Sequence, residues 1–230
     1  MSAAGPRTAV EPDVASSTIA LEARGLAHRY ARGRGLQRID FAVRAPGVVA
    51  ITGANGTGKS TLLRIVAGLL RPSEGTLAFT HAGRTLAPLA RRATIGFASP
   101  ELAFYPELTA AENLRFAATA HGLADGDGAV AAALGAMGLS SRARDRVGAL
   151  SSGMTQRLRL AFAVLHRPPV LLLDEPGAHL DDEGRRTLEA HVAAHARAGG
   201  LVLIATNEER EWRLADERIE LAGRGLGDPA

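Results

Sequence analysis

The residues best suited to chemistry form a glycine-rich octapeptide, Gly53-Ala54-Asn55-Gly56-Thr57-Gly58-Lys59-Ser60. It matches the phosphate-loop pattern, in which backbone N–H groups close around phosphate oxygens. The helix that follows directs the positive end of its dipole at the same oxygens. We expect Lys59 to reach the β and γ phosphates, Ser60 to ligate Mg²⁺ and Thr61 to complete the site. The octapeptide therefore predicts binding of a nucleotide together with magnesium.

A second candidate site lies where the apolar run Val170–Leu173 ends in two acids, Asp174 and Glu175. Two carboxylates at the end of a buried strand indicate a site at the carboxyl edge of a parallel sheet, where α/β proteins bind ligands. Asp174 suits the magnesium shell, and Glu175 is placed to orient or deprotonate an attacking water. The alternative is a pair of acids that opens a solvated loop.

A third motif, Leu150-Ser151-Ser152-Gly153-Met154-Thr155-Gln156-Arg157, resembles the signature sequence of ATP-binding cassette (ABC) ATPases. It stands shortly before the acidic strand, as it does in that family. A capped helix start with small residues can present N–H groups and serine hydroxyls to a phosphate. The resemblance implies that Ser151, Ser152 and Gly153 contact ATP bound on another subunit. It extends over residues 18–221.

The same resemblance assigns two further positions. Tyr30 stands where an aromatic side chain stacks on adenine in the family, although a tyrosine at a strand end can also serve packing alone. Residues 178–181 resemble the loop that crosses the dimer interface, which places Asp181 at the bound ATP.

Two positions depart from the family pattern. Pro100, flanked by Ser99 and Glu101, stands where the family has a glutamine that contacts magnesium and the attacking water. Asn207 replaces the switch histidine. Asparagine can donate a hydrogen bond to the γ-phosphate but carries no proton near neutral pH. We expect active but altered hydrolysis, with Asn207 in the catalytic set. The alternative is that the family tolerates both replacements with little effect.

Alternating strands and helices must position these residues. Residues 48–52 form a continuous apolar run that predicts a strand buried on both faces, and residues 62–70 follow at helical spacing. Thr109 and Glu112 have the spacing of a capping box at a helix start. Further strands are expected at 18–26, 36–43, 75–79, 94–97, 170–173, 201–205 and 215–221, and further helices at 128–137, 152–166 and 181–197.

This alternation predicts an α/β fold with a mostly parallel central sheet. The resemblance implies a P-loop NTPase with an N-terminal antiparallel β part and a helical subdomain inserted at about 100–167. We expect a flexible tail at 1–17, an ABC ATPase domain at 18–222 and a C-terminal tail at 223–230.

Composition excludes several classes of protein. The 230 residues are 46% hydrophobic and 22% charged, which is typical of a globular protein. Cysteine is absent, which excludes disulfides and thiol chemistry, and the apolar runs are far shorter than the ~18 residues of a membrane span. Lys59 is the single lysine among 27 basic residues, and the formal net charge is +3, so no nucleic-acid partner is expected.

Together these features predict an ATP-hydrolysing subunit of an ABC transporter, with ATP and Mg²⁺ as cofactors. The resemblance implies a homodimer with two shared ATP sites below a transmembrane permease subunit, hence a cytoplasmic protein held peripherally at the inner face of the membrane. The Ser-Gly-Met of the signature resembles exporters of the type-2 permease and haem-exporter groups. Two alternatives remain: a regulatory nucleotide-binding cassette with weak or no hydrolysis, and a soluble ABC ATPase associated with nucleic acid.

Overall fold

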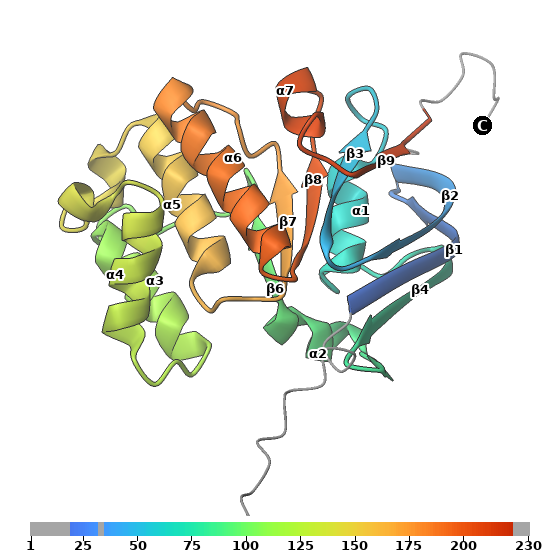
Figure 1. The fold of residues 1–230 in the computed structure, drawn as a ribbon, viewed down its shortest axis with the longest axis horizontal. Coiled ribbons are helices and arrows are strands. Elements are labelled where there is room, and N and C mark those ends of the chain that lie inside the picture. Colours follow the sequence, from blue (N-terminus) through green and yellow to red (C-terminus); the bar gives the residue numbers. More distant parts are fainter. Residues whose placement is uncertain (1–18, 32–34, 223–230) are drawn as a thin grey trace, which may run out of the picture.

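The computed structural model describes residues 19–31 and 35–222, which form two sheets flanked by helices (Figure 1). The first sheet has the strand order β6-β7-β8-β3-β9, and the second has the order β2-β1-β4-β5. The tails expected at 1–17 and 223–230 lie outside the described residues.

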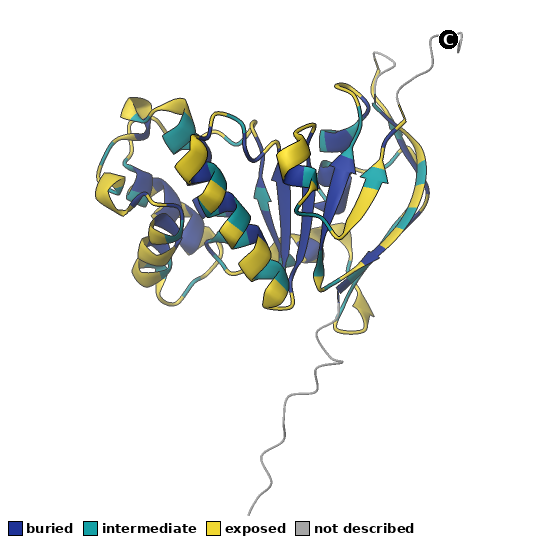
Figure 2. Ribbon diagram, turned by 45° about the horizontal axis from the view of Figure 1, so that its top comes forward, coloured by how far each residue is buried: buried dark blue, intermediate teal, exposed yellow. Residues whose placement is uncertain are grey.

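The five-stranded sheet is parallel and forms the centre of the molecule. Strands β7 and β8 are buried along their whole length, as the dark blue arrows in Figure 2 show. Such unbroken apolar runs are typical of strands covered on both faces. The sheet confirms the predicted α/β fold. Its strands are β3 (Gly47–Thr52), β6 (Ile95–Ala98), β7 (Val170–Asp174), β8 (Leu201–Ala205) and β9 (Glu217–Glu220).

The four-stranded sheet is antiparallel, as expected for the N-terminal part. The first half of β1 alternates between buried and more exposed residues, because one face of the strand turns toward the core. The strands are β1 (Ile19–Arg29), β2 (Gly35–Arg44), β4 (Glu74–His81) and the short β5 (Arg84–Thr85).

Five helices of eight residues or more flank the sheets: α1 (Lys59–Val66), α3 (Ala110–Ala120), α4 (Gly126–Ala136), α5 (Ser152–Val164) and α6 (Asp182–Arg197). Shorter elements are α2 (Pro88–Arg91), α7 (Glu209–Trp212) and 3₁₀ turns at Arg92–Thr94, Ser140–Arg142 and Val147–Ala149. Within residues 19–31 and 35–222, no helix has the length and apolar character to cross a bilayer.

Helix α1 begins at Lys59, as expected for the helix that follows the phosphate loop, but it ends at Val66, so its expected continuation to residue 70 was wrong. Gly58 has a φ of 102°, which lets the chain turn into the helix immediately after the loop. Gly68 has a φ of 71°, and its N–H donates to Ile65 O at 3.0 Å, a typical left-handed helix end. The apolar residues after this glycine therefore lie outside the helix.

The capping box predicted at the start of α3 is present. Thr109 Oγ1 accepts a hydrogen bond from Glu112 N at 3.1 Å, and Glu112 Oε2 accepts one from Thr109 N at 2.8 Å. The bonds from Thr109 lower the pKa of the Glu112 carboxyl. The cap therefore fixes where α3 begins after the segment that leaves β6.

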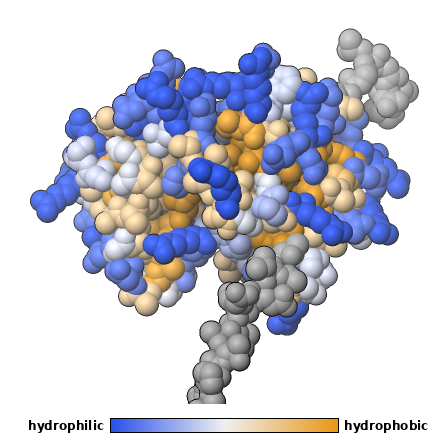
Figure 3. All heavy atoms as spheres, in the orientation of Figure 1, coloured by the Kyte–Doolittle hydropathy of each residue, from blue (hydrophilic) through white to orange (hydrophobic). Residues whose placement is uncertain are grey.

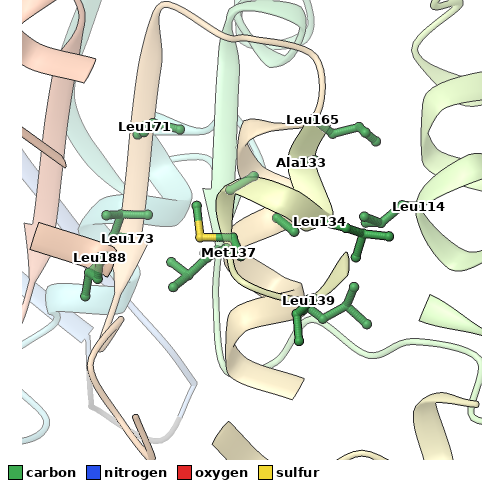
Figure 4. Close-up of a cluster of buried hydrophobic side chains, with 14 of the residues drawn as sticks. Leu114, Ala133, Leu134, Met137, Leu139, Leu165, Leu171, Leu173 and Leu188 are labelled. Carbon is green, nitrogen blue, oxygen red and sulfur yellow. The ribbon is translucent and has the colours of Figure 1, made fainter. Parts of the chain in front are cut away.

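Each face of the five-stranded sheet has its own hydrophobic cluster, because successive strand residues point to opposite faces. On β7, Leu171 and Leu173 pack with α3 to α6, whereas Val170 and Leu172 pack with α1 and the antiparallel sheet. Figure 4 shows the first cluster, in which Met137 lies between the helices and β7. Consequently, α1 and α5 lie on opposite faces of the sheet (Figure 1).

Candidate functional site

The glycine-rich octapeptide connects β3 to α1, as its sequence predicts. The backbone of Gly53 has a φ of 140°, and a methyl group there would lie 2.6 Å from Leu221 O. A methyl group on Gly58 would lie 2.8 Å from Leu36 Cα in β2. Both glycines are therefore required, one for its conformation against Leu221 and the other for close contact with β2.

Lys59 is the first residue of α1 and is buried. Its Nζ donates to Gly53 O at 2.7 Å, to Ala54 O at 3.4 Å and to Asn207 Oδ1 at 3.0 Å. Burial lowers the pKa of the amine, and the negative charges of Glu175 and Asp174 oppose this effect. The ammonium is thus positioned inside the loop, where it can contact a phosphate.

Asp174 and Ser60 bring two side-chain oxygen atoms together beside the loop. Ser60 Oγ donates to Asp174 Oδ1 at 3.1 Å. Burial raises the pKa of the Asp174 carboxyl, and the hydrogen bond from Ser60 partly opposes it. A buried carboxylate next to a hydroxyl is the hard oxygen donor set that Mg²⁺ prefers, so these residues fit the metal.

Glu175 follows Asp174 with an uncommon backbone conformation. Its φ is 47°, in the left-handed region that residues with a Cβ rarely adopt. Its N–H donates to Ala205 O at 2.9 Å, at the end of β8, and its side chain is exposed. The carboxylate therefore lies at the carboxyl edge of the sheet, within electrostatic reach of Lys59.

Asn207 lies directly beside the phosphate loop, although it stands 152 positions after Asn55 in the sequence. Its Nδ2 donates to Asn55 Oδ1 at 2.6 Å, while its Oδ1 accepts from Lys59. A lysine has donors only, so the amide oxygen must face Lys59 and the NH₂ group is left for another acceptor. The switch position can therefore offer a donor at this site without a titrating group.

The signature residues lie at the start of α5. Ser151 Oγ caps the helix by accepting from Met154 N at 3.2 Å, and Ser152 is exposed. A methyl group on Gly153 would lie 2.7 Å from His179 O, so the helix contacts the loop after β7 closely. Because α5 and α1 lie on opposite faces of the sheet, one chain does not bring the signature and the phosphate loop together.

Asp181 is the N-cap residue of α6. Its carboxylate caps α6 by accepting from Gly184 N at 2.8 Å, and it forms an ion pair with Arg157 of α5. These bonds lower its pKa, so the carboxylate is charged at neutral pH.

Tyr30 lies near the start of α1, with its OH 3.4 Å from Thr61 Oγ1. Its ring is partly exposed and packs edge-on against His28, with 4.6 Å between ring centroids. The exposed part of the ring can stack on a base beside the phosphate loop.

Sequence reasoning missed several contacts of the segment after β6, where the family glutamine is replaced. Ser99 is buried, Pro100 is exposed, and Glu101 forms an ion pair with Arg64 of α1. Sequence reasoning also missed that the buried Gln156 donates its Nε2 to the backbone carbonyls of Glu175 and Pro176. The sequence feature that could have indicated this role is a polar residue on the otherwise apolar, buried face of α5.

A sequence family described as ABC transporter matches residues 36–178 of the chain. The cytochrome c biogenesis ATP-binding export protein CcmA of Vibrio cholerae is 34% identical over 193 residues, which span 84% of this chain and 91% of that protein. The linearmycin resistance ATP-binding protein LnrL of Bacillus subtilis is 30% identical over 209 residues, which span 89% and 67% of the two chains.

A solved structure shares the fold. The dimeric post-hydrolysis state of the ATP-binding cassette MJ0796, bound to ADP and Pi, matches 87% of this chain and 94% of its own, with a TM-score of 0.77 and 23% identity. This likeness confirms the predicted P-loop NTPase fold. The family match covers the phosphate loop, the signature and the acidic strand end. The chain therefore belongs to the ABC transporter family, as an ATP-binding and ATP-hydrolysing subunit.

Proposed function

We propose that two copies of this chain enclose two MgATP molecules and drive export through a separate membrane subunit. The observation that carries this proposal is the placement of the phosphate loop and the signature on opposite faces of one sheet. A γ-phosphate held by one copy then meets Ser151–Gly153 and Asp181 of the other. ATP binding closes the dimer and hydrolysis reopens it.

Each residue of the site has one role in this proposal. Lys59 and the loop N–H groups hold the phosphates, while Ser60 and Asp174 hold Mg²⁺. Bound Mg²⁺ neutralises charge on the β and γ phosphates. Glu175 takes a proton from the attacking water. The water oxygen bonds to the γ-phosphorus, and the bond between the γ-phosphorus and the β–γ bridging oxygen breaks. Asn207 donates Nδ2 to the γ-phosphate in place of Asn55.

An exposed apolar patch supports the proposal that the chain binds a membrane subunit. Tyr105, Leu108 and Phe116 are exposed, and the rings of Tyr105 and Phe116 pack edge-on with 6.0 Å between centroids. Exposed aromatic residues of this kind mark protein interfaces. Figure 3 shows that the helical part also has a largely apolar surface in this view, whereas hydrophilic residues gather along the upper edge.

The proposed direction and location follow from the relatives and from the patch. The two curated relatives carry the names of an export protein and of a resistance protein. Export is therefore the direction we propose. The membrane subunit would bind this patch and hold the chain at the inner face of the membrane.

Phe116→Asp should abolish co-purification with a candidate membrane subunit expressed together with this chain, while basal ATP hydrolysis stays unchanged. A buried interface aromatic contributes about 2 kcal/mol, or about thirtyfold in affinity, and the new charge opposes docking. Ala131→Asp, the same type of change at an exposed position of α4, serves as the control. Retained co-purification of Phe116→Asp with normal yield would contradict docking at this patch.

Asn207→Ala should lower ATP turnover about ten- to a hundredfold, because it removes one hydrogen bond to a charged group worth ~1.5 to 3 kcal/mol in the transition state. Asn207→His should stay active and become sensitive to pH near 6 to 7, where imidazole titrates. Steady-state phosphate release across pH measures all three proteins. Equal turnover in the parent and Asn207→Ala, with a much faster Asn207→His, would show that Asn207 makes no contribution.

A further inference from the structure

The strained backbone of Glu175 is held from two sides. Its N–H donates to Ala205 O, and its C=O accepts from Gln156 Nε2 at 3.4 Å. The same Nε2 donates to Pro176 O at 3.0 Å. A left-handed conformation in a residue with a Cβ persists when its surroundings fix it. Gln156 therefore helps to set where the Glu175 carboxylate points.

Gln156 is 2% exposed, and a second side chain fixes its amide. Arg159 lies three residues later on α5, and its Nη1 donates to Gln156 Oε1 at 3.2 Å. This bond orients the amide so that its NH₂ group faces the two carbonyls of the Glu175 loop. Without Arg159, the oxygen of the buried Gln156 amide loses its hydrogen-bond donor, and the amide loses its preference for one orientation.

Arg159 also reaches the segment that leaves β6. Its Nε donates to Leu102 O at 3.1 Å. Three residues after Leu102, the backbone of Tyr105 is bound by the Asn113 side chain: Tyr105 N donates to Asn113 Oδ1 at 2.9 Å, and Asn113 Nδ2 donates to Tyr105 O at 3.1 Å. Tyr105 belongs to the apolar patch assigned above to the membrane partner. Hydrogen bonds through Arg159 and Gln156 thus join the carbonyl of Leu102 to the backbone of Glu175.

We propose that Arg159 and Gln156 are positioning residues that connect the segment 102–105 to Glu175, an inference that rests on the proposed roles of Glu175 and of the patch. A shift of the Leu102 carbonyl moves the guanidinium, which reorients the Gln156 amide and changes its hold on Glu175. This connection supplies a route from the partner surface to the reacting water in a chain where Pro100 replaces the family glutamine.

The test compares Arg159→Met, Gln156→Leu and the double variant in steady-state ATP hydrolysis. Each single change should lower kcat about three- to tenfold with KM for ATP unchanged, because the phosphate loop is untouched. If Arg159 acts through Gln156, the double variant should be no slower than Gln156→Leu. Arg115→Met, which removes an exposed arginine paired with Asp127, is the matched control and should not change kcat.

Two further variants keep the test decisive. Gln156→Glu retains an acceptor for Arg159 but has no donor for the loop carbonyls, so its kcat should also fall even if Gln156→Leu fails to fold. Arg159→Lys can reach only one acceptor at a time and should be intermediate. An unchanged kcat in Arg159→Met, additive losses in the double variant, or an equal loss in Arg115→Met would overturn the connection. An inactive parent chain would instead count against the proposed function.

Discussion

Glu175→Gln should lower ATP turnover by about a hundredfold or more and leave the chain as a stable dimer in MgATP. Positioned general bases contribute about 10² to 10⁴ in rate, and a glutamine of the same shape cannot accept a proton. Lys59, Ser60 and the start of α5 are unchanged, so both halves of each ATP site still bind. Phosphate release measures the first effect, and size-exclusion chromatography with light scattering measures the second.

The control for this result is Glu183→Gln, an exposed carboxylate in the first turn of α6 that receives the same chemical change. It should hydrolyse ATP at the parental rate and remain monomeric after turnover. A Glu175→Gln chain that stays monomeric at saturating MgATP would contradict the shared site. A Glu175→Gln chain that hydrolyses ATP at the parental rate would contradict the role of Glu175 as the general base.

Lys59→Ala should weaken MgATP binding about ten- to a hundredfold. The ammonium makes a charge-assisted contact with the β and γ phosphates, and losing such a contact costs ~1.5 to 3 kcal/mol. The effect is direct because Lys59 is the chain's single lysine and lies inside the loop. Isothermal titration calorimetry with MgATP measures the dissociation constant.

Lys59→Arg separates charge from geometry at the same position. The guanidinium keeps the positive charge but is planar and larger than the ammonium, which lies between Gly53 O, Ala54 O and Asn207 Oδ1. We expect it to bind MgATP nearly as weakly as Lys59→Ala does. Parental affinity in Lys59→Ala would show that the octapeptide does not hold the phosphates.

The phosphate loop and the end of β7 could be predicted from sequence because their signals are local. Residues 48–60 contain the strand, the glycines and the lysine within one short segment, and the run 170–175 shows a buried strand ending in acids. The parallel sheet followed from the same apolar runs. The proximity of the phosphate loop and the acidic end of β7 could also be predicted, because the carboxyl ends of parallel strands meet at one edge of the sheet.

Other contacts depend on packing between distant segments and left no local signal. The pairing of Asn207 with Asn55 joins residues 152 positions apart, and nothing near either residue predicts it. The Arg159 bond to Leu102 O joins residues 57 positions apart. The end of α1 was misjudged for a different reason: apolar residues continue beyond Gly68, but its left-handed backbone stops the helix.

The alternation of side chains along β7 and β8 also determines how the chain loses its structure. Leu171 and Leu172 are neighbours in sequence, yet each supports a different hydrophobic cluster. Detaching the helices or the antiparallel strands would expose one face of β7 and β8 to water, at about 25 cal/mol per Å² of apolar surface. We therefore expect the antiparallel and helical parts to unfold as one cooperative unit, and a nucleotide bound at the sheet's carboxyl edge to stabilise both.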